Sequence, residues 1–342
     1  MNDSAEETVQ VTHGAGGRKM DELLGDHVLN ALSSKSAGSI GLDQLDDGAT
    51  VDGAGEGTLV LTTDSHIVDP LFFPGGDIGR LAVCGTVNDL AVMGAKPLAL
   101  TSSLIVEEGF PMAELDRVMA AMEEASKEAG VPIITGDTKV MGKGDIDGLA
   151  INTAGLGTVD EPVSDAGMNP GDKVILTGTV GDHGMALMQY REGLSFKTRL
   201  ESDMAPLNGL LREARKAGEV TAMKDPTRGG LAAALNEMTE KSGHGVTIDE
   251  AAIPIREAVS GVADLIGISP YEVANEGKAI LVVDPESSAA VLDRLREHPL
   301  GREAGLIGEV TDERPGKVVM ETEVGGKRFL EAPVGDPVPR IC

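Results

Sequence analysis

The sequence contains few aromatic side chains and no tryptophan. Aromatic residues make up 2% of its 342 residues, so any hydrophobic core must be built from aliphatic side chains and methionine. Proteins that bind single-stranded nucleic acid stack the bases on aromatic side chains. The composition therefore argues against a nucleic-acid-binding protein.

Positive charge is also scarce. The chain has 29 Lys and Arg against 56 Asp and Glu, a formal net charge of -27 at pH 7. A nucleic acid would be repelled by this charge. Such acidity is typical of proteins from a salty cytoplasm, where ions screen the self-repulsion, but ordinary acidic proteins share it.

Cysteines are scarce too, and long apolar segments are absent. Two cysteines, Cys84 and Cys342, form no disulfide framework, and Cys84 lies in an apolar run. No apolar run approaches the roughly 18 to 20 residues that span a bilayer. The first eight residues are polar and acidic, unlike a signal peptide. We therefore expect a cytoplasmic protein without membrane contact.

The chain does contain an alternation of apolar strands and helices, which is typical of α/β or α+β layers. Prolines and glycines cluster between residues 160 and 171 and indicate a domain boundary. We predict an N-terminal domain over 1–160, a C-terminal α/β domain over 171–325 and a tail over 326–342. The clearest helices are expected at 77–93, 112–129, 206–217 and 231–241, and the clearest strands at 59–64, 98–106, 133–135, 149–156, 173–177, 279–283 and 318–321.

The last twelve residues contain three prolines and cannot form a helix. They predict an extended, mobile tail that reaches roughly 40 Å. The tail ends in Cys342, whose thiol cannot serve a core there. An accidental surface cysteine is the plain interpretation, but exposed cysteines are seldom left without a use. A swinging covalent carrier, which presents the thiol to a partner and then to an internal site, is the more economical one.

A Gly-rich segment, 13–19, leads directly into a predicted helix. Glycines allow close approach to a phosphate, and a helix N-terminus supplies N–H groups. The spacing matches neither the P-loop nor the dinucleotide fingerprint, so a flexible turn is the alternative. The candidate nucleotide-binding residues here are Gly14, Gly16, Gly17, Arg18 and Lys19.

Three aspartates stand at the ends of predicted elements. Asp64 ends a strand, Asp89 lies in Asn88-Asp89-Leu90, and Asp137 follows the strand at 133–135 in a turn that continues to Lys139. Magnesium prefers such oxygen ligands and bridges to phosphates. Helix caps and turns are the alternative for each aspartate. The glycines of the segment 225–230 indicate equally an anion site or a helix cap.

Together these segments resemble the HypE family of hydrogenase maturation proteins, within the aminoimidazole-ribonucleotide synthetase-like (PurM-like) superfamily. The resemblance covers essentially the whole chain, and the final Pro-Arg-Ile-Cys is its most specific part. It rests on 13–20, 62–64, 88–90, 136–139, 225–230 and 339–342. It implies a two-domain PurM-like fold and a homodimer, in which the N-terminal sheets of two subunits form a barrel with nucleotide nearby.

The resemblance also implies a reaction. A HypF-like carbamoyltransferase would place a carbamoyl group on Cys342, and the chain would use ATP and Mg²⁺ to dehydrate this thiocarbamate to a thiocyanate. The cyano group would pass to iron held by a HypC–HypD complex, for a [NiFe] hydrogenase. The implied roles are Glu276 as base, Lys139 as its assistant, Asp64, Asp89 and Asp137 as magnesium ligands, Thr138 with these aspartates at the phosphates, and Gly14 to Lys19 over the nucleotide.

Two other interpretations stay open at this point. A small-molecule kinase or synthetase of the same superfamily, such as thiamine-monophosphate kinase, would need no terminal cysteine. Selenophosphate synthetase is disfavoured because no cysteine accompanies the Gly-rich segment. A non-catalytic carrier of a group on Cys342 would turn over no ATP.

Overall fold

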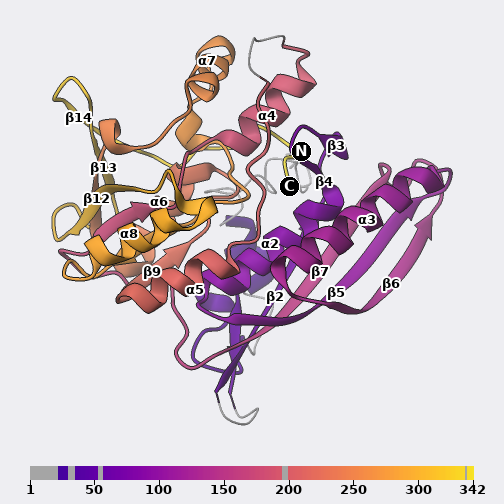
Figure 1. Cartoon of the computed structure of the whole chain (residues 1–342), viewed down its shortest axis with the longest axis horizontal. Coiled ribbons are helices and arrows are strands. Elements are labelled where there is room, and N and C mark those ends of the chain that lie inside the picture. Colours follow the sequence, from indigo (N-terminus) through magenta and orange to yellow (C-terminus); the bar gives the residue numbers. More distant parts are fainter. Residues whose placement is uncertain (1–21, 30–34, 53–56, 195–198, 336) are drawn as a thin grey trace, which may run out of the picture.

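The chain folds into two lobes, each built on its own main sheet (Figure 1). The structure is a computed structural model that describes residues 22–29, 35–52, 57–194, 199–335 and 337–342. No helix among these residues is long and apolar enough to cross a bilayer.

The first lobe contains a five-stranded sheet in the order β1-β2-β7-β5-β6. Strands β5 and β6 are parallel, and the other neighbours are antiparallel. The strands are β1 (Ala49–Val51), β2 (Thr58–His66), β5 (Lys96–Glu107), β6 (Ile133–Met141) and β7 (Leu149–Val159), with a small hairpin of β3 (Phe72–Phe73) and β4 (Gly76–Asp77).

Helices α2 (Ile78–Val92) and α3 (Met112–Ala129) pack together in this lobe. The Asp77 side chain caps α2 by accepting hydrogen bonds from the N–H groups of Gly79 at 2.8 Å and Arg80 at 3.1 Å. Almost all of α2 is buried, because it packs on β2, β7 and β5 and also on α5 (Asn208–Ala217) of the second lobe. This helix therefore joins the two hydrophobic cores.

The second lobe has a seven-stranded sheet in the order β14-β13-β10-β12-β8-β11-β9. Its strands are β8 (Lys173–Leu176), β9 (Val220–Lys224), β10 (Gly245–Asp249), β11 (Ile280–Val283), β12 (Gly305–Thr311), β13 (Val318–Glu321) and β14 (Lys327–Phe329). Its helices are α4 (Asp182–Arg191), α5 (Asn208–Ala217), α6 (Gly230–Ser242), α7 (Glu257–Ile266) and α8 (Ser288–Glu297). Short turns of helix lie at Leu24–Val28, Leu42–Gln44, Glu250–Ala252, Pro270–Glu272 and Pro299–Gly301.

The predicted helices at 77–93 and 112–129 are confirmed almost to the residue. The strand predicted at 133–135 was too short, and the turn predicted after it is wrong, because β6 continues to Met141 and holds Asp137 at its centre. From Ile134 onward every residue of β6 is exposed, since β6 is an edge strand. Its sequence therefore lacks the apolar pattern of a buried strand.

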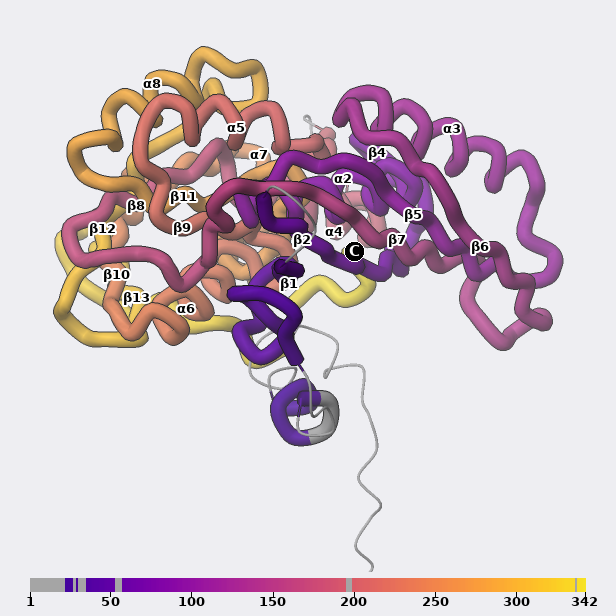
Figure 2. Tube along the Cα trace, turned by 90° about the horizontal axis from the view of Figure 1, so that it is seen from below, coloured from indigo at the N-terminus to yellow at the C-terminus, as the bar shows by residue number. Residues whose placement is uncertain are grey.

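The tail contains bends at 334–335 and 337–340 and packs against the rest of the chain. Residues 327–329 form β14 and pair with β13, so the segment that leaves the sheet begins after Phe329. Val338 is fully buried and Ile341 is 2% exposed, both in the core cluster shared with α2 and α4. Figure 2 shows the C-terminus between the lobes, below β2 and β7. Burial of these two apolar side chains thus stabilises the position of a tail that its prolines alone predicted to be mobile.

Candidate active site

A cavity of about 850 Å³ lies between the two lobes. Both lobes and the tail contribute to its walls. The polar lining residues are Lys35, Asp46, Asp47, Thr62, Thr63, Asp64 and Asp89 from the first lobe, Lys224, Asp225, Thr227, Arg228, Glu237, Glu240, Lys241 and Glu276 from the second, and Cys342 from the tail. The cavity therefore brings together four of the predicted site residues, namely Cys342, Glu276, Asp64 and Asp89.

Strand β2 and helix α2 place the two aspartates. Residues of β2 alternate between the two sheet faces, so Thr62 and Asp64 share one face. The Thr62 hydroxyl donates a hydrogen bond of 2.9 Å to the Asp89 carboxyl on α2. A Cβ on Gly85 would come within 3.2 Å of Asp64 Oδ2, so glycine allows α2 to approach the strand closely.

The carboxyl groups of the cavity repel one another in a buried setting. Burial, followed by the charges of Asp225 and Asp64, raises the pKa of Asp89 well above its ordinary value. Burial, followed by the charge of Asp47, raises the pKa of Asp225 to about 7. Burial and the neighbouring carboxylates both disfavour the ionised forms of these groups. A cationic ligand would stabilise the ionised forms, so the cluster favours such a ligand.

Two lysines offset part of this charge. Lys224 Nζ lies 2.8 Å from Asp47, 3.3 Å from Glu237 and 3.4 Å from Asp165. Burial alone would lower the pKa of Lys224, but these carboxylates hold it well above its usual range. Lys241 Nζ pairs with Asp165 at 2.7 Å. Asp47, Lys224 and Glu237 were not predicted from the sequence, because nothing in their local pattern shows that three distant segments meet. Asp225 was predicted only as part of a possible helix cap or anion site.

Glu276 is the most unusual carboxyl group of the cavity. It is 4% exposed, and its Oε1 atom has no hydrogen-bond partner within the described part of the chain. Burial, followed by the charges of Asp225 and Asp64, raises the pKa of Glu276 well above its ordinary value. A carboxylate in this setting is a stronger base than one in water.

The two cysteines differ in their surroundings. Cys84 on α2 is completely buried, and burial raises the pKa of its thiol to about 12. Cys342 is partly exposed and lines the cavity. Only Cys342 is therefore placed for chemistry.

The remaining predicted residues do not meet in the cavity of a single chain. Asp137 and Lys139 form an exposed ion pair of 3.1 Å on β6, next to Thr138, and none of the three lines the cavity. Gly14, Gly16, Gly17, Arg18 and Lys19 lie outside the described residues.

The described residues include no group of three or more His, Cys, Asp or Glu side chains placed to hold a metal ion. Magnesium, however, is usually bound by one or two carboxylates, with phosphate oxygens and water as its other ligands. Burial, reinforced by neighbouring carboxylates, raises the pKa values of Asp89 and Asp225, and a bound cation would stabilise their ionised forms. The cavity thus fits a magnesium ion that arrives with phosphate better than one bound by protein alone.

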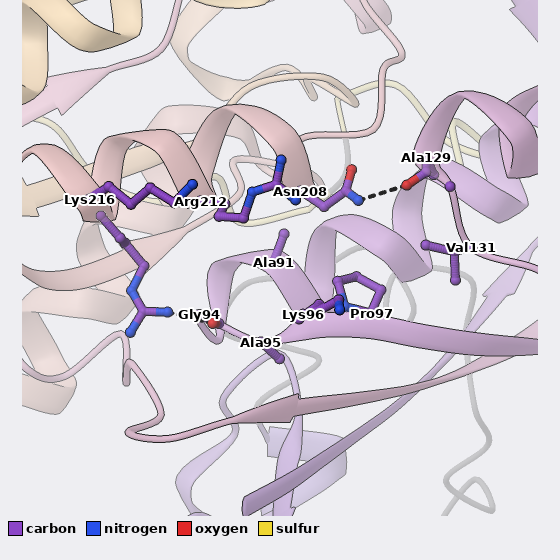
Figure 3. Close-up of a pocket in the computed structure, with 12 residues that line it drawn as sticks. Ala91, Gly94, Ala95, Lys96, Pro97, Ala129, Val131, Asn208, Arg212 and Lys216 are labelled. Atoms are coloured by element: carbon purple, nitrogen blue, oxygen red, sulfur yellow. Dashed lines mark hydrogen bonds between the residues drawn. The ribbon is translucent and has the colours of Figure 1, made fainter. Parts of the chain in front are cut away.

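A second cavity, of about 320 Å³, lies apart from these residues at the end of α2 and along α5 (Figure 3). Three of its four cationic side chains are already paired. Arg215 donates to the Gly94 and Glu161 carbonyls, and Arg212 and Lys216 pair with Glu213. The larger cavity is therefore the candidate active site.

Comparison with known proteins agrees with this geometry. Residues 45–159 match the family model of the N-terminal domain of AIR synthase related proteins, and residues 169–321 match the model of the C-terminal domain. A protein of Rhizobium leguminosarum bv. viciae named carbamoyl dehydratase HypE is 47% identical over 345 residues, which cover 99% of this chain and 97% of the relative. The chain belongs to the HypE family. The predicted family and its two-domain α/β fold are thus confirmed.

Solved structures of HypE proteins have the same fold. The chain matches HypE in a HypE–HypF complex with a TM-score of 0.85 and 43% identity, over 91% of this chain and 99% of that one. It matches HypE in complex with ATP with a TM-score of 0.81 and 42% identity, over 98% of this chain and 100% of that one.

Proposed function

We propose that this chain is an ATP-dependent carbamoyl dehydratase that acts on its own Cys342. One observation carries the proposal: Cys342 lines the same cavity as Glu276, Asp64 and Asp89. Membership of the HypE family supports it, because a relative covering almost the whole chain is named carbamoyl dehydratase. A passive carrier would need no buried carboxyl group of raised pKa in the cavity that its cysteine lines.

The proposed reaction removes the oxygen of an S-carbamoyl group on Cys342. The carbamoyl oxygen attacks the terminal phosphorus of ATP, ADP leaves, and the oxygen becomes part of a phosphate ester. Two protons leave the nitrogen, the carbon–oxygen bond breaks with release of phosphate, and a carbon–nitrogen triple bond forms. The products are S-cyano-Cys342, ADP and inorganic phosphate. Phosphorylation is needed because an amide oxygen is a poor leaving group.

Glu276 is the proposed base for the nitrogen protons. Its raised pKa suits proton transfer near neutral pH, and burial keeps water from competing for the activated carbon. Asp64 and Asp89 would hold Mg²⁺, which when bound neutralises charge between carboxylates and phosphate oxygens. Gly14, Gly16, Gly17, Arg18 and Lys19 are proposed to cover the nucleotide.

We further propose a homodimer that uses the outer face of the first sheet. Leu61 on β2 and Leu156 on β7 are paired in register and are 49% and 36% exposed. Exposed apolar side chains that adjoin on a sheet favour burial against another surface. Asp137 on β6 shares this face, because it is in register with Ser103, which pairs with Asn152. A second copy packed here would bring Asp137, Thr138 and Lys139 to the neighbouring cavity.

The proposed partners follow from the chemistry of the tail. A HypF-like carbamoyltransferase would load Cys342, as the HypE–HypF complex of a relative suggests. A HypC–HypD complex would accept the cyano group for iron. Two cysteines that form no disulfide with each other suit a reducing cytoplasm.

Intact-protein mass spectrometry tests the function. The chain is incubated with a HypF-type carbamoyltransferase, carbamoyl phosphate and ATP, with Cys342→Ser as the control. We expect one carbamoyl group on the native chain, which then loses one water, and no adduct on the control. A chain left unmodified by a transferase active on another HypE would contradict the proposal. A carbamoylated chain that never consumes ATP would point to a carrier.

A further inference from the structure

Helix α4 holds the backbone of the docked tail. The Arg191 guanidinium at its end donates hydrogen bonds to the carbonyl groups of Pro339, at 2.7 Å, and Arg340. The same guanidinium donates to the Asp69 carbonyl, and the Asp69 N–H donates to the Arg340 carbonyl at 3.2 Å. Arg191 therefore ties the tail both to α4 and to the first lobe.

His183, at the start of α4, holds the next carbonyl group. Its side chain is completely buried, and its Nε2 atom lies 2.9 Å from the Ile341 carbonyl oxygen. A carbonyl oxygen only accepts, so Nε2 carries a proton. In the neutral ring Nδ1 then accepts from the Ser202 hydroxyl at 2.7 Å. Burial lowers the pKa of His183, which favours this neutral form. The bonded carbonyl belongs to the residue immediately before Cys342.

Shape contributes as well. A Cβ on Gly184 would meet Ile341 Cδ1 at 3.0 Å, so the tail packs closely on α4. Arg340 adopts a φ of 54°, a left-handed conformation that is unfavourable for a residue with a side chain. The contacts on both sides of Arg340 offset this strain, so the docked state depends on them.

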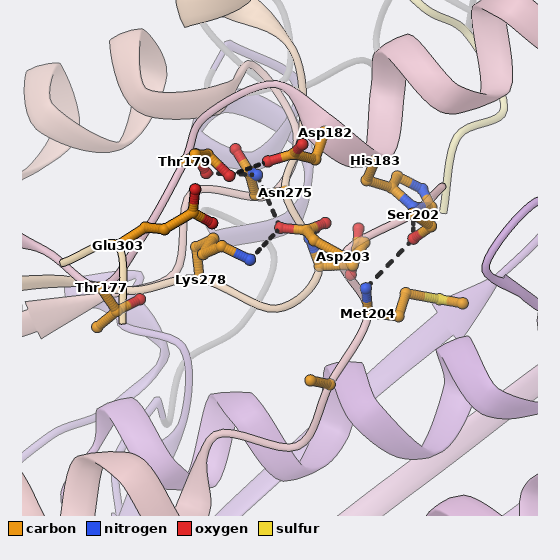
Figure 4. A network of polar contacts seen from close by, with 12 residues as sticks. Thr177, Thr179, Asp182, His183, Ser202, Asp203, Met204, Asn275, Lys278 and Glu303 are labelled. Carbon is orange, nitrogen blue, oxygen red and sulfur yellow. Dashed lines mark hydrogen bonds and ion pairs between the residues drawn. The ribbon is translucent and has the colours of Figure 1, made fainter. Parts of the chain in front are cut away.

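Asp203, which follows Ser202, holds the loop that carries Glu276. Figure 4 shows Asp203 between Asn275 and Lys278 of this loop. Asp203 accepts hydrogen bonds from the Glu276 N–H at 3.1 Å, the Asn275 amide at 2.8 Å and the Lys278 ammonium group at 3.1 Å. A Cβ on Gly277 would lie 1.9 Å from the Asp203 carbonyl oxygen, so only glycine fits between them. Two adjacent residues, Ser202 and Asp203, therefore connect the tail to the proposed base.

We propose that His183 and Arg191 are positioning residues that form a tail latch, and that Ser202–Asp203 aligns the latched tail with the loop of Glu276. The latch sets how often Cys342 is inside the cavity. The effect of the latch on the reaction rests on the proposed function. A partner can carbamoylate Cys342 only when the tail is undocked, whereas dehydration requires a docked tail. Weakening the latch should therefore change the two steps in opposite directions.

The docking equilibrium is measurable without the enzymatic reaction. Native protein is treated with iodoacetamide, and alkylation of Cys342 is followed by intact mass; the buried Cys84, with a pKa of about 12, does not compete. Arg191→Ala removes charged hydrogen bonds from the docked state only, so alkylation should be on the order of 10-fold faster than in the native chain. Arg302→Ala, at an exposed arginine of the second lobe, is the matched control and should leave the rate unchanged. Equal rates in all three proteins would overturn the latch.

The two half-reactions then test the consequence. Carbamoylation of Cys342 by the transferase and ATP-dependent loss of water are timed separately in Arg191→Ala, His183→Leu and His183→Gln. We expect the first two variants to be loaded at least as fast as the native chain but to lose water about 10-fold more slowly. His183→Gln, whose amide can still donate to Ile341, should recover much of the second step. A parallel fall of both steps in Arg191→Ala and His183→Leu would mean damage to the fold and would overturn the latch. If no protein is carbamoylated, the proposed function fails while the alkylation rates still decide the latch.

Discussion

At the scale of single residues, burial decides which carboxyl groups of the cavity can act as bases. Asp64 keeps a 34% exposed side chain, whereas Glu276 and Asp225 are almost completely enclosed. Desolvation disfavours their charged forms and raises their pKa values, as the two buried groups show. Carboxyl groups within one cavity thus differ in how strongly burial disfavours their charged forms.

Glu276→Gln should stop dehydration and leave nucleotide binding intact. The amide keeps the shape of the side chain but cannot take a proton, so loss of water from S-carbamoyl-Cys342 should slow by roughly 10² to 10⁴. Intact mass measures the loss, and equilibrium titration measures ATP binding. Glu219→Gln, at an exposed glutamate, is the control. Normal thiocyanate yield in Glu276→Gln would remove this residue from the mechanism.

Asp225 should make the folded state less stable as pH rises. Its folded pKa of about 7 lies above the ordinary value of 3.8, so its contribution is fully present below about pH 4 and is lost as pH rises through about 7. Asp225→Asn cannot ionise and should escape this loss. Between about pH 5 and pH 8 its unfolding free energy should therefore gain roughly 1 to 4 kcal/mol relative to the native chain. Urea unfolding at both pH values measures this difference in unfolding free energy, with Asp293→Asn, at an exposed aspartate, as the control. An equal pH dependence of the native chain and both variants would show that Asp225 ionises normally.

At the scale of elements, β6 is an edge strand whose predicted site residues do not line the cavity of their own chain. Asp137 and Lys139 share the sheet face on which Leu61 and Leu156 are exposed, and neither of them lines the cavity of its own chain. This arrangement is explained if the face is buried between two copies.

Leu156→Asp should then dissociate the dimer. A charged side chain at a buried apolar contact costs several kcal/mol, enough to shift the association strongly. Light scattering after size-exclusion chromatography gives the molar mass. Leu265→Asp, at a leucine of α7 that is 61% exposed, is the matched control and should not change the mass. A native chain that is already monomeric would exclude the dimer.

Mixing two inactive variants tests whether β6 acts across the dimer. Lys139→Ala removes the group on β6, and Glu276→Gln removes the proposed base. If the site is shared, one of the two sites in each mixed dimer is intact, so random exchange of subunits restores about a quarter of the native activity. No recovery, in a mixture shown to contain mixed dimers, would place Lys139 outside the neighbouring site.

At the scale of the whole molecule, the charge of -27 opposes folding by self-repulsion. Ions screen this repulsion, so the melting temperature should rise by several degrees between about 0.05 M and 1 M KCl. Thermal denaturation with NaCl and KCl should agree, because screening depends on ionic strength. Sucrose at matched osmolality is the control for effects unrelated to charge. A melting temperature independent of salt would show that the acidic residues are spaced too widely to repel.

Local pattern by itself determined the α/β class, the positions of α2 and α3, and the family, because helix periodicity, caps and short motifs such as Pro339 to Cys342 are readable along the chain. Tertiary structure alone decided that Lys224 meets Asp47 and Asp165, and that β6 stays outside its own cavity. It also decided that His183 and Arg191 hold the tail by hydrogen bonds, although its prolines predicted an extended, mobile segment. The physical reason is the same in each case: these contacts join residues far apart in sequence, and their energies depend on burial that no local pattern encodes.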